Sequence, residues 1–577
     1  MNTAELKTKS KRTDESLQST GAEAVIQSLR AEGVKTIFGY PGGAIMPIYD
    51  ALFHHLESVN HILTRHEQGA IHAAQGYART SGKTGVVFAT SGPGATNLIT
   101  GLADALIDST PLVCITGQVA SHLLGTDAFQ ETDVMGISMP VTKWNCQVTH
   151  AADIAPTLAK AFYIASSGRP GPVLVDITKD AQFEKLDFSY EKCTSVRSYQ
   201  PKPKLNVDQV QAAANLLNKA KKPLMIVGQG IMLSNAEEEL LAFTKKTGIP
   251  VASTLLGLGA FPSHHPLFVG MVGMHGNYAP NIKTNECDVL LAVGMRFDDR
   301  VTGDVSRYAR QAKVIHIDID TAEINKIIKA DAPIVADAKE ALSVLMNLVE
   351  KQTHQNWLDE FYQAKENELK VLSENREKEF SDELRMDLVI DLLSQKTNGN
   401  AIVVTDVGQH QMMAAQFYQY NQTKSNVTSG GLGTMGFALP AAIGAKMANP
   451  KKQVIAIIGD GGFQMTLQEL GTMMQNNIGV KIIILNNGYL GMVRQWQQMF
   501  FEKRYSFTDI QSPDFVALAA SYNINGQKVE RQEDLNHALD QLLNSENANL
   551  LEVKVAREDN VFPMVPTGAS VAEIRLQ

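Results

Sequence analysis

The sequence predicts an α/β protein with three doubly wound parallel-sheet domains. Short apolar runs such as Val454–Ile458 and Val480–Leu485 are typical of buried parallel strands, and segments with helical spacing lie between such runs. Glycine turns and polar residues follow the runs, as they do at the ligand-binding edge of doubly wound sheets. The 577 residues are enough for three or four domains, each with its own core.

Changes in composition divide the chain into segments. We expect a disordered tail at 1–20, a first domain at 21–185, a linker at 186–206, a second domain at 207–350, a charged helical linker at 351–383, a third domain at 384–555 and a C-terminal tail at 556–577. The stretch YQPKPKLN at 199–206 marks the first linker. The charges between 351 and 383 are typical of a solvated helix, with a partner-binding helix as the alternative.

The first domain is expected to begin with a helix over 22–33 and a strand over 34–40. A helix over Gly69–Arg79 follows Arg65-His66-Glu67, and spacing alone favours a solvated cap for these charged residues. A strand at 86–89, the turn SGPG at 91–94, a helix over 95–107 and a strand at 112–116 come next. This succession repeats the plan of the third domain, which indicates two related α/β units.

In the second domain, strands are expected at 224–227, 251–254, 289–293 and 314–319. The turn Gly228-Gln229-Gly230 lacks the full dinucleotide spacing and is interpreted as structural. Arg296 and Asp318 stand at strand ends, where arginine can neutralise a diphosphate and a carboxylate can accept hydrogen bonds from a ribose or adenine. A surface ion-pair network explains the same spacing equally well.

The third domain contains a βαβ unit, with strands at 454–458 and 480–485 and a helix over 466–476. Asp460 follows the first strand within the turn GDGG, and Asn487 follows the second, 27 residues later. Both offer oxygen ligands, which suit Mg²⁺ shared with phosphate oxygens, and the glycines allow the backbone to approach a diphosphate. By itself GDG is more often an ordinary turn, and the asparagine makes the ligand site the better interpretation.

Composition excludes several classes of protein. The net charge of −9 argues against nucleic acid as the main partner. Four scattered cysteines do not form a disulfide framework or a zinc motif, and no apolar run reaches the ~18–20 residues of a membrane span. The N-terminal stretch has no apolar core of a signal peptide and carries acidic residues that transit peptides avoid. We therefore expect a cytoplasmic protein.

The pair GDG and NN resembles the thiamine diphosphate signature. The stretches YPGGAIMPIYDAL (40–52), RHEQGA (65–70), SGPGATNLITGLADAL (91–106), GTDAFQETD (125–133), RFDDRVTG (296–303) and NNGYLGMVRQW (486–496) resemble the catalytic subunits of acetohydroxyacid synthases, also called acetolactate synthases. The resemblance runs from about Gly21 to Ser570. It implies pyrimidine-binding, central FAD-binding and diphosphate-binding domains, with thiamine diphosphate, Mg²⁺ and FAD as cofactors.

The same resemblance assigns roles to individual residues. It implies that Glu67 bonds N1′ of the cofactor's pyrimidine ring and that Met435 wedges under the cofactor, and it places further residues near the reacting atoms or the substrate channel, namely Gly43, Phe129, Gln130 and Lys179. It implies Mg²⁺ ligands from Asp460, Asn487 and the carbonyl of Tyr489. It implies further cofactor contacts from Gly408, Gln409, His410, Gly433, Gly459, Gly461 and Gly462. Ala120 stands where plant members usually have proline, which puts the local shape of the channel mouth in doubt.

Flavin contacts are implied for Arg169, Met274, His275, Gly294, Arg296, Asp318 and Asp337. An acceptor pocket is implied for Arg300, Met492 and Trp496, although tryptophan is more often simply packed in a core. The C-terminal tail could close the substrate channel. These roles together predict the decarboxylation of pyruvate and transfer of the two-carbon unit to pyruvate or 2-oxobutyrate, giving 2-acetolactate or 2-aceto-2-hydroxybutyrate for branched-chain amino acid biosynthesis.

The resemblance further implies a homodimer or homotetramer with active sites between subunits, and a small regulatory subunit. The reaction involves no net redox change, so the flavin is expected to have a structural role. Two alternatives stay open. One is a flavin-using, thiamine-dependent pyruvate oxidase, which would consume oxygen or reduce a quinone. The other is a non-catalytic homologue, against which the presence of Glu67, Asp460 and Asn487 argues.

Overall fold

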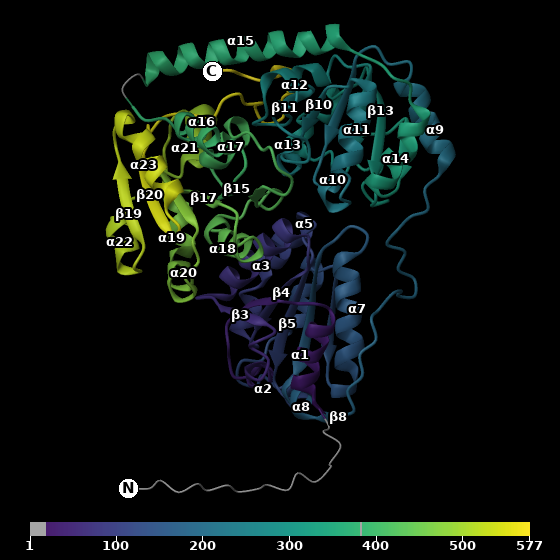
Figure 1. Ribbon diagram of the computed structural model, residues 1–577, viewed down its shortest axis with the longest axis vertical. Coiled ribbons are helices and arrows are strands. Elements are labelled where there is room, and N and C mark those ends of the chain that lie inside the picture. Colours follow the sequence, from purple (N-terminus) through teal and green to yellow (C-terminus); the bar gives the residue numbers. More distant parts are fainter. Residues whose placement is uncertain (1–18, 381–382) are drawn as a thin grey trace, which may run out of the picture.

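The computed structural model describes residues 19–380 and 383–577, so residues 1–18 of the predicted tail lie outside the described part. The chain forms three α/β units, each built on a six-stranded parallel sheet, and an antiparallel pair of β1 (Ser19–Thr20) and β8 (Lys185–Leu186). Figure 1 shows the N-terminal unit below, the central unit at upper right and the C-terminal unit at left. The predicted fold class is confirmed.

The first and third sheets have the same strand order. The N-terminal sheet runs β3 (Asn60–Leu63), β2 (Thr36–Gly39), β4 (Gly85–Ala89), β5 (Leu112–Gln118), β7 (Pro172–Thr178) and β6 (Trp144–Val148). The C-terminal sheet runs β16 (Asn426–Thr428), β15 (Ile402–Thr405), β17 (Val454–Gly459), β18 (Lys481–Asn486), β20 (Asn549–Lys554) and β19 (Asn525–Val529). Counted in chain order, both sheets read 2-1-3-4-6-5. The expected repeat of plan is therefore confirmed.

The central sheet has a different order, β11 (Phe268–Met271), β10 (Val251–Ser253), β9 (Pro223–Val227), β12 (Val289–Val293), β13 (Lys313–Asp318) and β14 (Ala332–Val335). In chain order this is 3-2-1-4-5-6, the order of dinucleotide-binding sheets, which bind ligands beyond the carboxyl ends of the strands where the order reverses. Gly228 and Gly294 meet there, because a Cβ added to Gly228 would lie 2.2 Å from the Gly294 carbonyl oxygen. The glycine turn therefore permits close backbone contact at the switch point.

Helices cover both faces of the sheets. In the N-terminal unit they are α1 (Gly21–Ala31), α2 (Met46–Phe53), α3 (Glu67–Ser81), α4 (Pro93–Thr96), α5 (Ile99–Ile107), α6 (Val134–Ser138), α7 (Ile154–Ser166) and α8 (Lys179–Phe183). In the central unit they are α9 (Val207–Leu217), α10 (Gly230–Leu233), α11 (Glu237–Thr247), α12 (Tyr278–Thr284), α13 (Asp299–Thr302) and α14 (Ala338–Leu348). In the C-terminal unit they are α16 (Met386–Thr397), α17 (Gln409–Phe417), α18 (Ala438–Ala448), α19 (Asp460–Thr466), α20 (Leu470–Asn476), α21 (Gly491–Phe500), α22 (Phe515–Ser521) and α23 (Gln532–Asn544).

Alternate residues of each central strand enter cores on opposite faces. In β12, Val289, Leu291 and Val293 pack into one core, whereas Leu290 and Ala292 pack into another. Both faces of the strand are therefore apolar, and its sequence is a continuous apolar run instead of an alternation of apolar and polar residues. Each sheet is thus the middle layer of a three-layer sandwich.

Two predicted helices differ from the structure. The helix expected over 95–107 is divided into α4 and α5, and the helix expected over 466–476 begins earlier, as α19 at Asp460, and continues after a 3₁₀ turn at Leu467–Glu469 as α20. An aspartate in the first turn is favourable because the helix N-terminus is partially positive. The predicted strands at 251–254 and 314–319 each end one residue earlier, at Ser253 and Asp318.

The N- and C-terminal units are joined by the close crossing of α3 and α18. A Cβ added to Gly76 would lie 1.9 Å from the Ala441 carbonyl oxygen, and one added to Gly444 would lie 1.7 Å from that of Ala73. No larger side chain fits at either glycine without separating the helices. The crossing therefore fixes how the first unit sits against the third.

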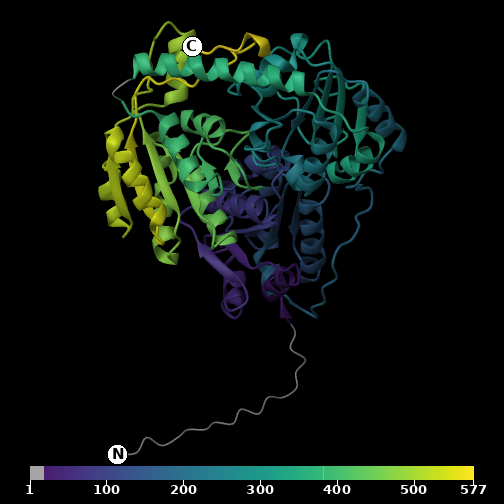
Figure 2. The ribbon, with the colours of Figure 1, turned by 45° about the horizontal axis from the view of Figure 1, so that its top comes forward.

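Helix α15 (Gln355–Glu379) bridges the central and C-terminal units within the predicted linker at 351–383. Figures 1 and 2 show it running across the top of the molecule. Near its start, the Trp357 indole N–H donates to the Pro223 carbonyl over 2.9 Å, and near its end Arg376 pairs with Asp387 at 2.9 Å. Both ends are thus fixed to different units by buried polar contacts.

Candidate active site

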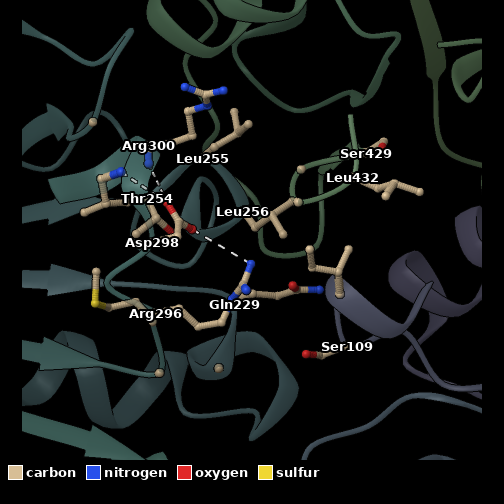
Figure 3. Close-up of a pocket in the computed structure, with 18 of the residues that line it drawn as sticks. Ser109, Gln229, Thr254, Leu255, Leu256, Arg296, Asp298, Arg300, Ser429 and Leu432 are labelled. Carbon is tan, nitrogen blue, oxygen red and sulfur yellow. Dashed lines mark hydrogen bonds and ion pairs between the residues drawn. The ribbon is translucent and has the colours of Figure 1, made fainter. Parts of the chain in front are cut away.

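A cavity of about 780 Å³ lies where the three units meet. Figure 3 shows Ser109 from the end of the N-terminal helix α5, Gln229 and Arg296 from the central unit, and Ser429 and Leu432 from a C-terminal loop around it. The cavity extends over the carboxyl ends of β9 and β12, where the central sheet reverses its order. This is the expected position of a ligand in such a fold.

All the residues predicted to contact a flavin line this cavity: Arg169, Met274, His275, Gly294, Arg296, Asp318 and Asp337. Two of them, one buried and one partly buried, are polar groups that suit a ligand. His275 Nδ1 is buried without a hydrogen-bond partner in the described chain, and burial lowers the pKa of His275 to about 4. Burial raises the pKa of Asp318 to about 6. A large polar ligand would give His275 Nδ1 a partner and would bind the Asp318 carboxylate, whose Oδ1 already accepts from the Asp320 amide at 2.9 Å, so these polar groups fit a dinucleotide.

Other members of this set already have protein partners. Arg169 forms ion pairs with Asp320 at 3.1 Å and Glu323 at 2.9 Å. Asp337 caps α14 by accepting hydrogen bonds from the Lys339 and Glu340 amides. The Arg296 guanidinium lies 3.8 Å from the Asp298 carboxylate. Arg296 is thus the cation of the set that is most available to a diphosphate.

A smaller cavity of about 60 Å³ adjoins the first and collects the predicted diphosphate and metal residues. Its lining includes Gly408, Gln409, His410, Gly459, Asp460, Gly461, Gly462, Asn487 and Tyr489. Gly408, Met435 and Met492 line both cavities, and Gly433 lines the larger one. The two cavities therefore share a wall, and Met435 lies in that wall.

The predicted metal residues are Asp460 at the start of α19, Asn487 after β18 and Tyr489 two residues further on. Burial raises the pKa of Asp460 to about 6, and its carboxylate accepts only one long side-chain hydrogen bond in the described structure, from Ser512 at 3.3 Å. Asn487 Nδ2 donates to Gln409 at 3.1 Å, and Asn487 Oδ1 accepts from the Tyr489 amide at 3.1 Å. A buried carboxylate that lacks a charged partner suits a cation.

No group of three histidine, cysteine or acidic side chains within residues 19–380 and 383–577 is arranged to hold a metal. The predicted set differs in kind from such a group, because it combines one carboxylate, one amide and one backbone carbonyl. Mg²⁺ is commonly bound in this way, with phosphate oxygens completing its shell.

His410 shapes the floor of the smaller cavity. Its Nε2 accepts a hydrogen bond from the Gly459 amide at 3.2 Å, and burial lowers its pKa to about 3, so the ring is neutral. A Cβ added to Gly408 would lie 2.7 Å from this ring, and one added to Gly459 would lie 2.9 Å away. Both glycines are therefore required for the imidazole to pack against the strand end.

The predicted acceptor residues Arg300, Met492 and Trp496 line the larger cavity. Trp496 lies on α21, half-buried, with its ring centroid 5.3 Å from that of Phe500. The alternative of a tryptophan simply buried in a core is thus wrong for this position. Arg300 has a largely exposed side chain, with Asp299 as a loose partner at 3.6 Å. Its guanidinium remains available to a substrate carboxylate.

Glu67 is the first residue of α3 and is 8 % exposed. The solvated-cap interpretation of this residue is therefore wrong. The cap is His66, whose Nδ1 accepts the Gln68 amide at 3.1 Å, so Glu67 can turn inward. Asn97 Nδ2 donates to Glu67 Oε2 at 2.9 Å.

The remaining predicted residues lie on the N-terminal unit but not in the lining of either cavity, and neither does Glu67. These residues are Gly43, Phe129, Gln130 and Lys179. Phe129 is 88 % exposed, and Gly43 is also exposed. Within one copy of the chain, the structure does not bring this group together with the diphosphate residues in a single cavity.

Sequence reasoning missed several residues at the site. Gln229 lines the larger cavity, so the purely structural interpretation of its glycine turn is wrong. Asn97, which contacts Glu67, lies in the stretch SGPGATN, in which the sequence pattern indicates only a glycine turn. The switch-point position of the turn after β9 was a signal that could have identified Gln229.

The fold is that of thiamine pyrophosphate enzymes. Residues 19–137 match the N-terminal TPP-binding domain of that family, residues 210–345 the central domain and residues 406–553 the C-terminal TPP-binding domain. No helix in the described ranges has both the length and the apolar character needed to cross a membrane.

Curated relatives narrow the family. An acetolactate synthase large subunit from Lactococcus lactis is 45 % identical, with 95 % of each chain covered. The acetolactate synthase isozyme 2 large subunit of Escherichia coli is 47 % identical, covering 96 % of this chain and 99 % of its own. That of Corynebacterium glutamicum is 46 % identical, covering 96 % and 90 %. The chain belongs to the acetolactate synthase large-subunit family.

Proposed function

We propose that this chain is the catalytic subunit of an acetolactate synthase, which decarboxylates pyruvate and joins the two-carbon unit to a second pyruvate or to 2-oxobutyrate. The main support for this proposal is the wall that the two cavities share. Gly408, Met435 and Met492 line both, so the residues predicted to hold the acceptor adjoin those predicted to hold the diphosphate. This arrangement supports the binding of an acceptor 2-oxoacid next to the reacting end of a bound thiamine cofactor.

Thiamine diphosphate, when bound, supplies the carbanion chemistry that protein side chains lack. Asp460, Asn487 and the Tyr489 carbonyl would hold Mg²⁺ against its diphosphate. Glu67 would exchange a proton with the cofactor's ring nitrogen, and the hydrogen bond from Asn97 keeps Glu67 Oε2 occupied so that Oε1 is the oxygen free to do so. Arg300 would bind the acceptor carboxylate, and Trp496 would bound the space for its alkyl chain.

FAD would occupy the larger cavity. The unpaired Nδ1 of His275, the glycine contact at the switch point and the available Arg296 support this assignment. Joining two 2-oxoacids with loss of CO₂ leaves the oxidation state balanced, so the flavin would shape the cavity and transfer no electrons.

A homodimer would complete the site. Glu67, Gly43, Phe129, Gln130 and Lys179 do not line the cavities of their own chain. The exposure of Phe129 supports a second copy as the partner that covers it. A small regulatory subunit belongs to the same proposal, because the relatives are named large subunits, and a tetramer of two such dimers is the alternative assembly.

The test is acetolactate formation from pyruvate by the purified protein, with thiamine diphosphate, Mg²⁺ and FAD omitted in turn and oxygen uptake followed in parallel. Product that requires all three without oxygen uptake is expected. Oxygen consumption that matches pyruvate use would overturn the synthase assignment in favour of a flavin-using pyruvate oxidase. Loss of activity in Glu67→Gln but not in the exposed Glu57→Gln would place the chemistry at this site.

A further inference from the structure

Two buried carboxylates of the N-terminal unit contact a C-terminal loop that lines the larger cavity. The loop is residues 429–436, which follows β16 and carries Met435. Asp104 lies on α5 and Asp108 caps its C-terminus, and both are essentially inaccessible to solvent. In sequence they precede the loop by more than three hundred residues.

Asp108 binds the backbone at the start of the loop. Its Oδ2 accepts from the Gly430 amide at 2.8 Å and its Oδ1 accepts from the Gly431 amide at 2.7 Å. Arg79 pairs with Asp108 at 2.8 Å and also donates to the Thr428 carbonyl. A buried carboxylate with two amides and one guanidinium is well satisfied and difficult to displace.

The two glycines are suited to this contact. A Cβ added to Gly430 would lie 2.8 Å from the Leu256 side chain, and one added to Gly431 would lie 2.8 Å from Ile107 and 3.0 Å from Asp108 Oδ1. Larger residues would push the loop away from α5. The sequence Ser-Gly-Gly therefore lets the backbone amides reach the carboxylate.

Asp104 binds side chains on either side of the two glycines. Its Oδ1 accepts from the Ser429 hydroxyl and from the Thr434 hydroxyl at 3.1 Å, while the Thr434 amide donates to Ser429 Oγ at 2.8 Å. On the other side of Met435, the Gly436 amide donates to Asp406 at 2.9 Å. Both neighbours of Met435 are thus held by buried carboxylates, so the backbone at Met435 has little freedom.

The second oxygen of Asp104 has no hydrogen-bond partner in the described chain. Burial and the nearby Asp108 raise the pKa of Asp104 to about 6, while Arg79, Ser429 and Thr434 act in the opposite direction. Keeping an under-satisfied carboxylate in a core costs stability, and apolar packing alone would not need it. A buried carboxylate of this kind is better explained by a role in positioning the residues that it binds.

We propose that Asp104 and Asp108 are positioning residues that hold the loop at 429–436, and with it Met435, at the wall between the two cavities. The inference rests on the proposed function, because Met435 would there contact the thiamine cofactor. The carboxylates themselves do not line either cavity and would act only through the loop.

The first experiment needs no cofactor. Hydrogen–deuterium exchange of the full-length apo-protein would be followed in peptides that span residues 428–436, for the wild type, Asp108→Ala, Asp108→Asn and the exposed control Asp153→Ala. The Gly430 and Gly431 amides should exchange about tenfold faster in Asp108→Ala, because both lose a buried acceptor, and by a smaller factor in Asp108→Asn. Exchange equal to that of Asp153→Ala would overturn the proposal.

The second experiment uses the fully loaded enzyme. Asp104→Ala should lower kcat about tenfold with a much smaller change in KM for pyruvate. Asp104→Asn keeps an oxygen that accepts from Ser429 and Thr434, so this variant should have most of the wild-type kcat. A fall in melting temperature with kcat unchanged would indicate a merely structural role and refute the proposal. If the wild type formed no acetolactate, the proposed function would fail, and the exchange data would still decide whether the loop is held.

Discussion

Asn97, in the turn between α4 and α5, donates a hydrogen bond from Nδ2 to Oε2 of Glu67, the first residue of α3, over 2.9 Å. The contact fixes the carboxylate orientation without adding charge. We predict that Asn97→Ala lowers kcat about tenfold, since a general acid must be held within hydrogen-bonding reach of its partner. Thiamine diphosphate affinity, measured by fluorescence quenching, should fall less than kcat.

Asn97→Asp is the matched variant, because it has the same shape and cannot donate to a carboxylate. Its pH–rate profile should differ from that of the wild type, as a second acid then faces Glu67. Identical profiles for the two proteins would count against a role for this contact.

Trp496 is expected to control the choice of acceptor. Trp496→Leu removes a wall of the larger cavity, so the preference for 2-oxobutyrate over pyruvate should fall about tenfold, with 2-acetolactate formation largely retained. Competition between the two acceptors, with both products quantified, measures this ratio. Trp144→Phe in β6, outside the cavity, serves as control. An unchanged product ratio in Trp496→Leu would exclude the residue from the pocket.

Asp460 should make the stabilisation of the protein by Mg²⁺ and thiamine diphosphate depend on pH. Its raised pKa, about 6, means that its contribution to stability is present at low pH and lost as pH rises through that value. Mg²⁺ with thiamine diphosphate should therefore raise the melting temperature more at about pH 7.5 than at about pH 5.5. EDTA should abolish the effect, and Asp460→Asn should lack it, whereas the exposed Asp391→Asn should retain it.

Asp559 should make stability depend on pH. Burial raises the pKa of Asp559 to about 7, with Arg376 and Arg385 opposing the shift and Asp387 and Glu379 adding to it. Because the folded pKa exceeds the unfolded one, the stabilising contribution is lost as pH rises toward and through about 7. The melting temperature of Asp559→Asn relative to the wild type should increase between about pH 5 and about pH 8. A difference that is constant with pH would contradict this.

The sheets could be predicted from sequence because their strands follow from short-range patterns, whereas the flavin contacts that line the larger cavity are implied only by the family resemblance. Apolar runs gave the strands, and the polar residues after them, such as Arg296 and Asp318, meet at one edge because parallel strands end together. Glu67 could not be placed by such patterns. Its burial depends on His66 acting as the helix cap, and histidine is not a residue that usually signals a cap.

Contacts between residues far apart in the chain could not be predicted from the sequence for a similar reason. Asp104 looks like any polar residue on an amphipathic helix until the fold brings Ser429 against it. The division between α4 and α5 likewise has no glycine or proline at the break to announce it. Tertiary structure, rather than local propensity, determines both features.

Helix α15 is 25 residues long, or about 37 Å at ~1.5 Å per residue, and none of its residues lines either cavity. It nevertheless links two units that wall the larger one, since Trp357 is fixed to the central unit and Arg376 to the C-terminal unit. Inserting one residue between them would advance the far end by ~1.5 Å and turn it by ~100°. A change in the length of α15 would therefore strain the junction between these two units and disturb the larger cavity from a distance.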